Sequence, residues 1–164
     1  DLQVTGEDIY VDTKLIEKMR DVLIHALRNC LDHGIETPDE RPDSKPEKGT
    51  ISINCFWDEQ DLVIEVSDDG RGVNIPKVKE KAYQKGFLKD DELDSVSQED
   101  VVEILFRPGF SMAEKVTDVS GRGVGMDVIR STMRELKGDA HLDTTIGEAT
   151  TLALRIPADY YQAL

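Results

Sequence analysis

Three groups of residues have types and spacings that suit the binding of a charged ligand. The first is His25, Asn29, Asp32 and Glu36, which would share one face of a helix because they lie three or four positions apart. The carboxamide oxygen of Asn29 is a hard donor of the kind that Mg²⁺ prefers, and His25 could orient or deprotonate a bound group. The alternative is a solvated helix face on which the asparagine lies by chance. Taken alone, this group of residues favours that alternative.

The second group is the segment Ser67–Gly72, with the sequence Ser-Asp-Asp-Gly-Arg-Gly. Apolar residues before it alternate on the inward face of a predicted strand, and Asp68 is the next position on that face. A buried carboxylate needs a partner, and the exocyclic amine of a base would serve. Gly70 and Gly72 would let such a ligand approach the backbone. The alternative is a turn that merely ends a strand, but the strand parity favours a site.

The third group is a glycine-rich stretch that follows the segment Phe106–Ser111 and precedes a predicted helix. Its glycines are Gly121, Gly123 and Gly125. Exposed N–H groups at the start of a helix suit phosphate oxygens. The spacing is neither that of a P-loop nor the G-x-G-x-x-G of a dinucleotide fold. By itself the stretch is also typical of a flexible linker.

The elements that would position these groups follow from hydrophobic periodicity. Steps of three and four residues predict helices at 12–34, 75–86, 97–106 and 124–136. Strict alternation predicts two hairpins, with strands at 51–57 and 62–66 and at 140–142 and 152–156. Weaker alternation over residues 2–12 predicts two short strands around Gly6.

Hairpins interleaved with long helices indicate an α+β fold, a two-layer sandwich in which helices cover one face of the sheet. The 164 residues suit one compact unit, and we expect residues 1–164 to form a single domain. The first residues resemble the interior of a domain, so we expect the chain to be a fragment of a larger multidomain protein.

The net charge of −14 disfavours binding to nucleic acid, because an acidic surface repels phosphate backbones. A phosphate site must then be built from backbone N–H groups, a few placed cations or a metal. No apolar run approaches the length of a membrane span, so direct membrane insertion is not expected. Cys30 and Cys55 fall on predicted apolar faces, and buried reduced thiols indicate a cytoplasmic location.

Taken together and in this order, the groups resemble the GHKL ATPase superfamily, the Bergerat-fold group that includes gyrase, MutL and histidine kinases. The resemblance narrows to the kinase domain of CheA-type chemotaxis histidine kinases. The segments that carry it are His25–Glu36, Asp68–Gly72, Leu105–Ser111 and Val119–Asp127. It extends from about Asp8 to Pro157. It implies a mixed, mostly antiparallel sheet with helices on one face and a mobile ATP lid at about residues 107–123.

The resemblance also implies roles for individual residues and two ligands, ATP and Mg²⁺. Asn29 would ligate the Mg²⁺ that bridges the ATP phosphates, and His25 would act near the γ-phosphate. Asp68 would accept the adenine amino group, in a base pocket shaped by Gly70 and Gly72.

Further ATP contacts are implied for residues of the first segment, of the lid and of the last hairpin. These are Arg28, Asp32, His33, Ser111, Gly121, Arg122, Gly123, Val124, Gly125, Met126, Thr150 and Thr151. Thr150 or Thr151 would support Asp68 around the base. The last hairpin departs from the family pattern Gly-x-Gly-Thr, because Ala149 replaces the second glycine, and the loop near the base would be stiffer.

The function implied is that of an ATP-dependent protein histidine kinase in a two-component system. It would transfer the γ-phosphoryl of ATP to a histidine on a separate phosphotransfer domain, from which a response regulator would receive it. Dimerisation of the parent and coupling to receptors would use domains outside this chain, which would itself be monomeric. Two alternatives stay open: a GHKL ATPase clamp, and a nucleotide-binding regulatory module without transfer activity.

Overall fold

The computed structural model describes residues 1–110 and 125–158. They form two compact units, one of residues 1–73 and 132–158 and the other of residues 74–110 and 125–131. Each unit is described by itself, and the expectation of a single domain stays a prediction.

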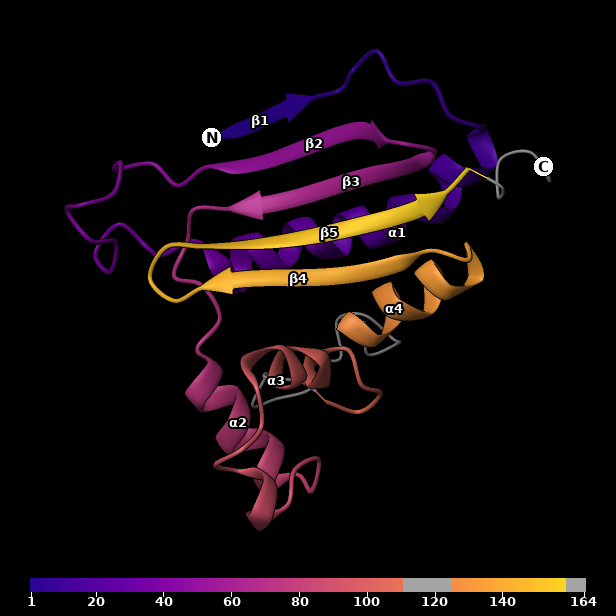
Figure 1. Cartoon of the computed structure of the whole chain (residues 1–164). Coiled ribbons are helices and arrows are strands. Elements are labelled where there is room, and N and C mark those ends of the chain that lie inside the picture. The colour runs from indigo at the N-terminus through magenta and orange to yellow at the C-terminus, as the bar shows by residue number, and fades with distance from the viewer. Residues whose placement is uncertain (111–124, 159–164) are drawn as a thin grey trace. The chain divides into compact units, whose positions relative to one another are not determined.

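The first unit is built on a five-stranded sheet with the strand order β1-β2-β3-β5-β4 (Figure 1). The strands are β1 (Leu2–Thr5), β2 (Ile51–Asp58), β3 (Asp61–Asp68), β4 (Asp139–Thr145) and β5 (Ala149–Pro157). β1 pairs with β2 in parallel, and the other neighbours are antiparallel. The mixed, mostly antiparallel sheet predicted for an α+β fold is therefore confirmed.

Short turns fix the register of the two hairpins. Asp58 pairs with Asp61, so the turn between β2 and β3 has two residues, and its first residue, Glu59, has a left-handed φ of 55°. In the second hairpin Thr145 pairs with Ala149, leaving a three-residue loop that contains Gly147 at φ 78°. Glycine adopts this conformation without a steric penalty, which makes it the favoured residue for such a loop.

Helix α1 (Thr13–Asn29) packs along one face of this sheet and runs behind β3 and β5 in Figure 1. Asp12 caps its start, because its side chain accepts a hydrogen bond of 2.7 Å from the N–H of Lys14. The helix buries an apolar stripe formed by Leu15, Met19, Val22 and Ala26. Burial of each of the larger side chains contributes about 1.5–3 kcal/mol, so this packing holds the end of α1 in place at the sheet.

The N-terminal segment corrects one expectation. Only Leu2–Thr5 forms a strand, and residues 7–12 are not in one. Gly6 has a φ of 83°, and its carbonyl accepts a hydrogen bond from the N–H of Ile9, so the chain turns away from the sheet edge. The weak alternation beyond Gly6 therefore does not indicate a second strand.

The second unit is helical. Its elements are α2 (Ile75–Gln84), a short 3₁₀ turn at Asp90–Glu92, α3 (Gln98–Leu105) and the first part of α4 (Met126–Glu135). The side chains of Asn74 and Ser97 cap α2 and α3. The rings of Phe87 and Phe110 meet edge to face with centroids 5.3 Å apart. Three of the four predicted helices are thus present at nearly the expected positions.

Candidate functional site

The remaining predicted helix, at residues 12–34, changes its winding next to Asn29, one of the polar residues of the candidate site. The α-helix ends at Asn29, and Cys30–Gly34 continue as a π-helical segment. In it the N–H of Ile35 donates to the carbonyl of Cys30 at 2.7 Å, five residues back. Such wide turns are rare and occur frequently at functional sites. His25 is buried here and Asn29 is half-buried, whereas Arg28 is exposed.

The π-helical segment alters which polar residues can act together. Asp32 and His33 are exposed, whereas Glu36 is buried beyond the end of the segment. Because the winding widens after Asn29, the three- and four-residue steps no longer place all four polar residues on one face. The single stripe predicted for His25, Asn29, Asp32 and Glu36 is therefore wrong for Glu36.

Asp68 lies at the end of β3 on the face that continues the buried apolar positions, as strand parity predicts. It is 5% exposed and pairs with Ile51 on one side and with Thr150 on the other. Its Oδ1 accepts a hydrogen bond of 3.0 Å from the N–H of Gly70. The segment after the strand therefore folds back onto the carboxylate.

Burial raises the pKa of the Asp68 carboxyl above its ordinary value, although the Gly70 N–H and the Cys30 thiol favour the ionised form. The neighbouring Cys30 has its pKa raised to about 12, by burial and then by the charge of Asp68. Cys30 therefore stays a thiol that donates to the carboxylate. A carboxylate with this little water around it gains from a ligand N–H donor, such as the amine of a base.

Three glycines let the backbone close around Asp68. A Cβ atom at Gly34 would lie 2.7 Å from the carboxyl atoms of Asp68. One at Gly70 would overlap the carbonyl of Gly34, and one at Gly72, whose φ is 66°, would overlap the carbonyl of Thr145. Gly70 and Gly72 are thus required by the approach of the chain to itself. Gly34, the last residue of the predicted helix 12–34, belongs to the same enclosure.

Thr150 and Thr151 lie on opposite faces of β5. Thr150 is paired with Asp68, so its side chain is on the same face as the carboxylate. Thr151 is paired with Ser67, and their hydroxyl groups are 2.8 Å apart. Of the two candidates for support of Asp68, the register places Thr150 beside it.

Gly125, the described end of the glycine-rich stretch, belongs to the other unit. Gly125 and Met126 are half-buried at the start of α4, where the N–H of Val128 donates to the carbonyl of Gly125 at 3.0 Å. The remaining candidates lie outside the described residues: Ser111, Gly121, Arg122, Gly123 and Val124. Most of the predicted lid at 107–123 lies outside them as well.

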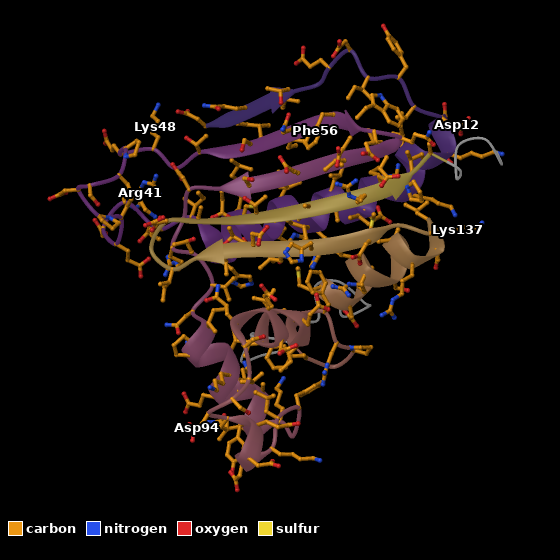
Figure 2. The ribbon with its side chains drawn as sticks, in the orientation of Figure 1. Asp12, Arg41, Lys48, Phe56, Asp94 and Lys137 are labelled. Atoms are coloured by element: carbon orange, nitrogen blue, oxygen red, sulfur yellow. The ribbon has the colours of Figure 1, made fainter. Side chains whose placement is uncertain are left out.

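A mostly buried cluster of charges adjoins the Asp68 segment, and of its members only Glu36 belongs to a group suggested by the sequence. Arg41 is 2.8 Å from Glu36 and 2.8 Å from Asp69, and Lys45 is 2.8 Å from Glu36. Burial opposes ionisation of Glu36, but its hydrogen bonds with Lys45 and Arg41 hold its pKa below the ordinary value. Arg41, labelled in Figure 2, projects from the loop between the π-helical segment and β2. The acidic and basic residues of this loop were a possible signal, but their pairing is not visible in sequence.

The donors of the site fit the ligands that the sequence suggested, a base and Mg²⁺. Asp68 and the close backbone around it fit a base that offers an N–H. Asn29 and the nearby Asp32 offer hard oxygen donors, which fit Mg²⁺. Among the described residues no group of three His, Cys, Asp or Glu side chains could hold a metal ion. A metal here would thus depend on phosphate and water oxygens.

No described helix is long and apolar enough to span a membrane.

Comparison with known proteins gives a match to one family and to several relatives. The model of the family described as "Histidine kinase-, DNA gyrase B-, and HSP90-like ATPase" matches residues 16–160. The chain is 42% identical to the chemotaxis protein CheA of Halobacterium salinarum and 39% identical to the sensor histidine kinase CheAY of Helicobacter pylori. Both alignments cover 96% of this chain, but only 24% and 20% of the relatives. The chain thus spans between a fifth and a quarter of their length.

Solved structures share the fold. The histidine kinase domain of the Erythrobacter litoralis EL346 blue-light activated histidine kinase has a TM-score of 0.56 and 15% identity, and the match covers 99% of this chain and 56% of that one. The nucleotide-free catalytic domain of the histidine kinase ThkA also gives 0.56 and 15%, over 96% of this chain and 76% of that one. At this level of identity the likeness concerns the fold alone.

Proposed function

Because this chain belongs to the family of histidine kinase-, DNA gyrase B- and HSP90-like ATPases, we propose that it is the ATP-binding catalytic domain of a CheA-type histidine kinase. It binds Mg-ATP and presents the γ-phosphoryl to a histidine on a separate phosphotransfer domain. The observation that carries the proposal is the buried carboxylate of Asp68 at the end of β3, with Thr150 beside it. The names of the chemotaxis relatives support the same class of kinase.

Asp68 would recognise the adenine base. Its carboxylate is already held by the Gly70 N–H and is poorly hydrated, so it can accept the exocyclic amine at a small cost in reorganisation. Thr150 would stabilise this arrangement from the adjacent strand, directly or through a water. Because Gly34 and Gly70 have no side chain, they would leave the space next to the carboxylate free.

Asn29 would hold the metal and His25 would lie near the reacting phosphoryl group. Mg²⁺, when bound, would neutralise charge on the phosphate oxygens. Phosphoryl transfer depends mainly on positioning and charge stabilisation, so one oxygen donor and a cradle of backbone N–H groups would be enough from this chain. Arg28, Asp32 and His33 are exposed at the same end of α1. Arg28 and His33 can contact phosphates there, and Asp32 can offer an oxygen to the metal. The lid residues would complete the cradle.

The partners are proposed from the same class of protein. The acceptor histidine would lie on a helical phosphotransfer domain, and a response regulator would take the phosphoryl from it. The parent would dimerise and couple to receptors through parts of the protein other than this domain.

The test is incubation of the chain with Mg-[γ-³²P]ATP and a histidine phosphotransfer domain from the same organism. Label on the acceptor histidine is the expected result. Release of free phosphate without labelled acceptor would favour an ATPase clamp instead. Tight ATP binding with neither product would favour a regulatory module, an alternative suggested by Ala149 in the last hairpin.

A further inference from the structure

The charge cluster of Glu36, Arg41, Lys45 and Asp69 joins the loop after α1 to the segment that carries Asp68. The side chains of Arg41 and Glu36 are only 3% and 6% exposed, and that of Lys45 is 13% exposed. Arg41 also donates through Nε to the carbonyl of Pro46 at 2.6 Å. The guanidinium thus contacts three parts of the chain, at Glu36, Pro46 and Asp69, which suits the fixed fork of arginine.

Both cations of the cluster contact the backbone next to Asp68. Nζ of Lys45 donates to the carbonyls of Asp69 at 2.9 Å and of Gly70 at 2.5 Å. Arg41 reaches the same Asp69 carbonyl at 3.3 Å. The Asp69 side chain is held as well, because its Oδ1 accepts from the N–H of Thr50 at 2.9 Å. The segment after β3 is therefore held by hydrogen bonds from Arg41 and Lys45 to its carbonyls, in addition to the pairing of the sheet.

One peptide unit links the cluster to the carboxylate. The carbonyl of Asp69 and the N–H of Gly70 belong to the same planar, trans peptide, and they point in opposite directions. Lys45 and Arg41 bind the carbonyl end, while the N–H end donates to Oδ1 of Asp68. Rotation of this peptide would break both sets of hydrogen bonds. The cations therefore act on Asp68 through the rigid Asp69–Gly70 peptide unit, whose carbonyl they bind and whose N–H binds the carboxylate.

The energetics indicate positioning more than stability as the role of the cluster. It contains two acidic and two basic side chains, so its charges balance. Burial of such groups costs desolvation energy, and buried ion pairs often stabilise a fold no better than apolar residues of the same size. What the cluster provides that apolar residues could not is a set of directed donors for the Asp69 and Gly70 carbonyls.

We propose that Arg41 and Lys45 are positioning residues that set base selectivity, because they lock the Asp69–Gly70 peptide that orients the carboxylate of Asp68. This inference rests on the proposed function, in which Asp68 recognises adenine. The cations bind the carbonyl end of the peptide, opposite the N–H that donates to Asp68, and would not contact the base. Loss of either one lets the peptide rotate, and the carboxylate then no longer distinguishes a base with an amine from one with a carbonyl at that position.

The test uses Lys45→Met, which keeps most of the aliphatic stem, and Arg41→Gln. The control is Arg155→Gln, which also removes a cation from an ion pair, but at the exposed pairs with Asp58 and Asp61. Affinities for Mg-ADP and Mg-GDP are measured by titration calorimetry, at a temperature below the thermal unfolding midpoint of each variant. We expect ADP to bind about tenfold more weakly to the two cluster variants, with a smaller change for GDP, and no change in the control.

Folded variants that keep the wild-type ratio of ADP affinity to GDP affinity would overturn the inference, whether both affinities fall equally or neither changes. If Arg41→Gln does not fold, Lys45→Met and the conservative Lys45→Arg decide. Lys45→Arg keeps the charge and should retain more of the ADP preference than Lys45→Met. A wild-type chain that binds no adenine nucleotide would contradict the proposed function itself, which is a different result from unchanged selectivity in the variants.

Discussion

Asp68 and Thr150 are directly paired across β3 and β5, so a carboxylate and a hydroxyl lie side by side at the end of the buried face. The relationship depends on the register between β3 and β5, since a shift of one residue would bring Thr151 to this position instead. The register therefore decides which threonine can assist base recognition.

The two threonines should respond differently to removal of their hydroxyl groups. Thr150→Val should weaken ADP binding about fivefold, because one hydrogen bond beside Asp68 is lost. Thr151→Val should leave ADP affinity unchanged but lower the free energy of unfolding by about 1 kcal/mol, since Thr151 bonds Ser67 on the other face. Calorimetric titration and urea denaturation of both variants measure the two effects. The opposite pattern would show that Thr151 is the residue near the base.

Gly34→Ala should impair nucleotide binding more than stability. The added methyl group would lie 2.7 Å from the carboxyl atoms of Asp68 and would push that side chain from its place. We expect ADP affinity to fall at least about tenfold, because the displaced carboxylate no longer meets the base in the productive geometry. Gly86→Asn is the matched control, because Gly86 has a φ of 76° that asparagine tolerates and open space around it. Unchanged affinity in Gly34→Ala would contradict the enclosure of Asp68.

Adenine binding should weaken as the pH falls through the raised pKa of Asp68. The amine of the base stabilises the ionised carboxylate, so the complex binds fewer protons than the free protein and affinity rises with pH. Burial raises the pKa of Asp68, and the loss should therefore begin at a higher pH than for an ordinary aspartate. Titrations with ADP at several pH values measure this. Asp68→Asn corrects for titration of the nucleotide, and equal pH profiles in the two proteins would refute the prediction.

Asn29→Ala should separate metal-dependent transfer from base recognition. The side chain lies at the end of α1, whereas Asp68 and Thr150 belong to β3 and β5. Removal of its oxygen donor should reduce transfer to the acceptor histidine by about a hundredfold or more, while the affinity for adenosine changes little. Labelling with Mg-[γ-³²P]ATP and titration with adenosine give the two values. A variant that transfers phosphoryl at the wild-type rate would exclude Asn29 as the metal ligand.

The strongly periodic parts of this chain were predictable from sequence, and the parts set by long-range contacts were not. Alternation of apolar residues predicted both hairpins and placed Asp68 on the buried face of its strand, because strand parity is a local property. The change to π-helical winding after Asn29 was not visible, since the same residues also fit an ordinary helix. The pairing of Arg41 with Asp69 joins residues 28 positions apart, and the loop sequence alone gives no partner for either.

The most direct measurement is the affinity of Asp68→Asn for Mg-ADP and Mg-GDP, compared with that of the wild type. The wild type should prefer ADP, and the variant should lose about ten- to a hundredfold in ADP affinity and much of this preference, because a hydrogen bond to a charged acceptor is lost. Its unfolding midpoint should be no lower than that of the wild type, since burial disfavours the ionised carboxylate that asparagine replaces. A folded Asp68→Asn variant with unchanged ADP affinity would contradict the assignment of this site to adenine.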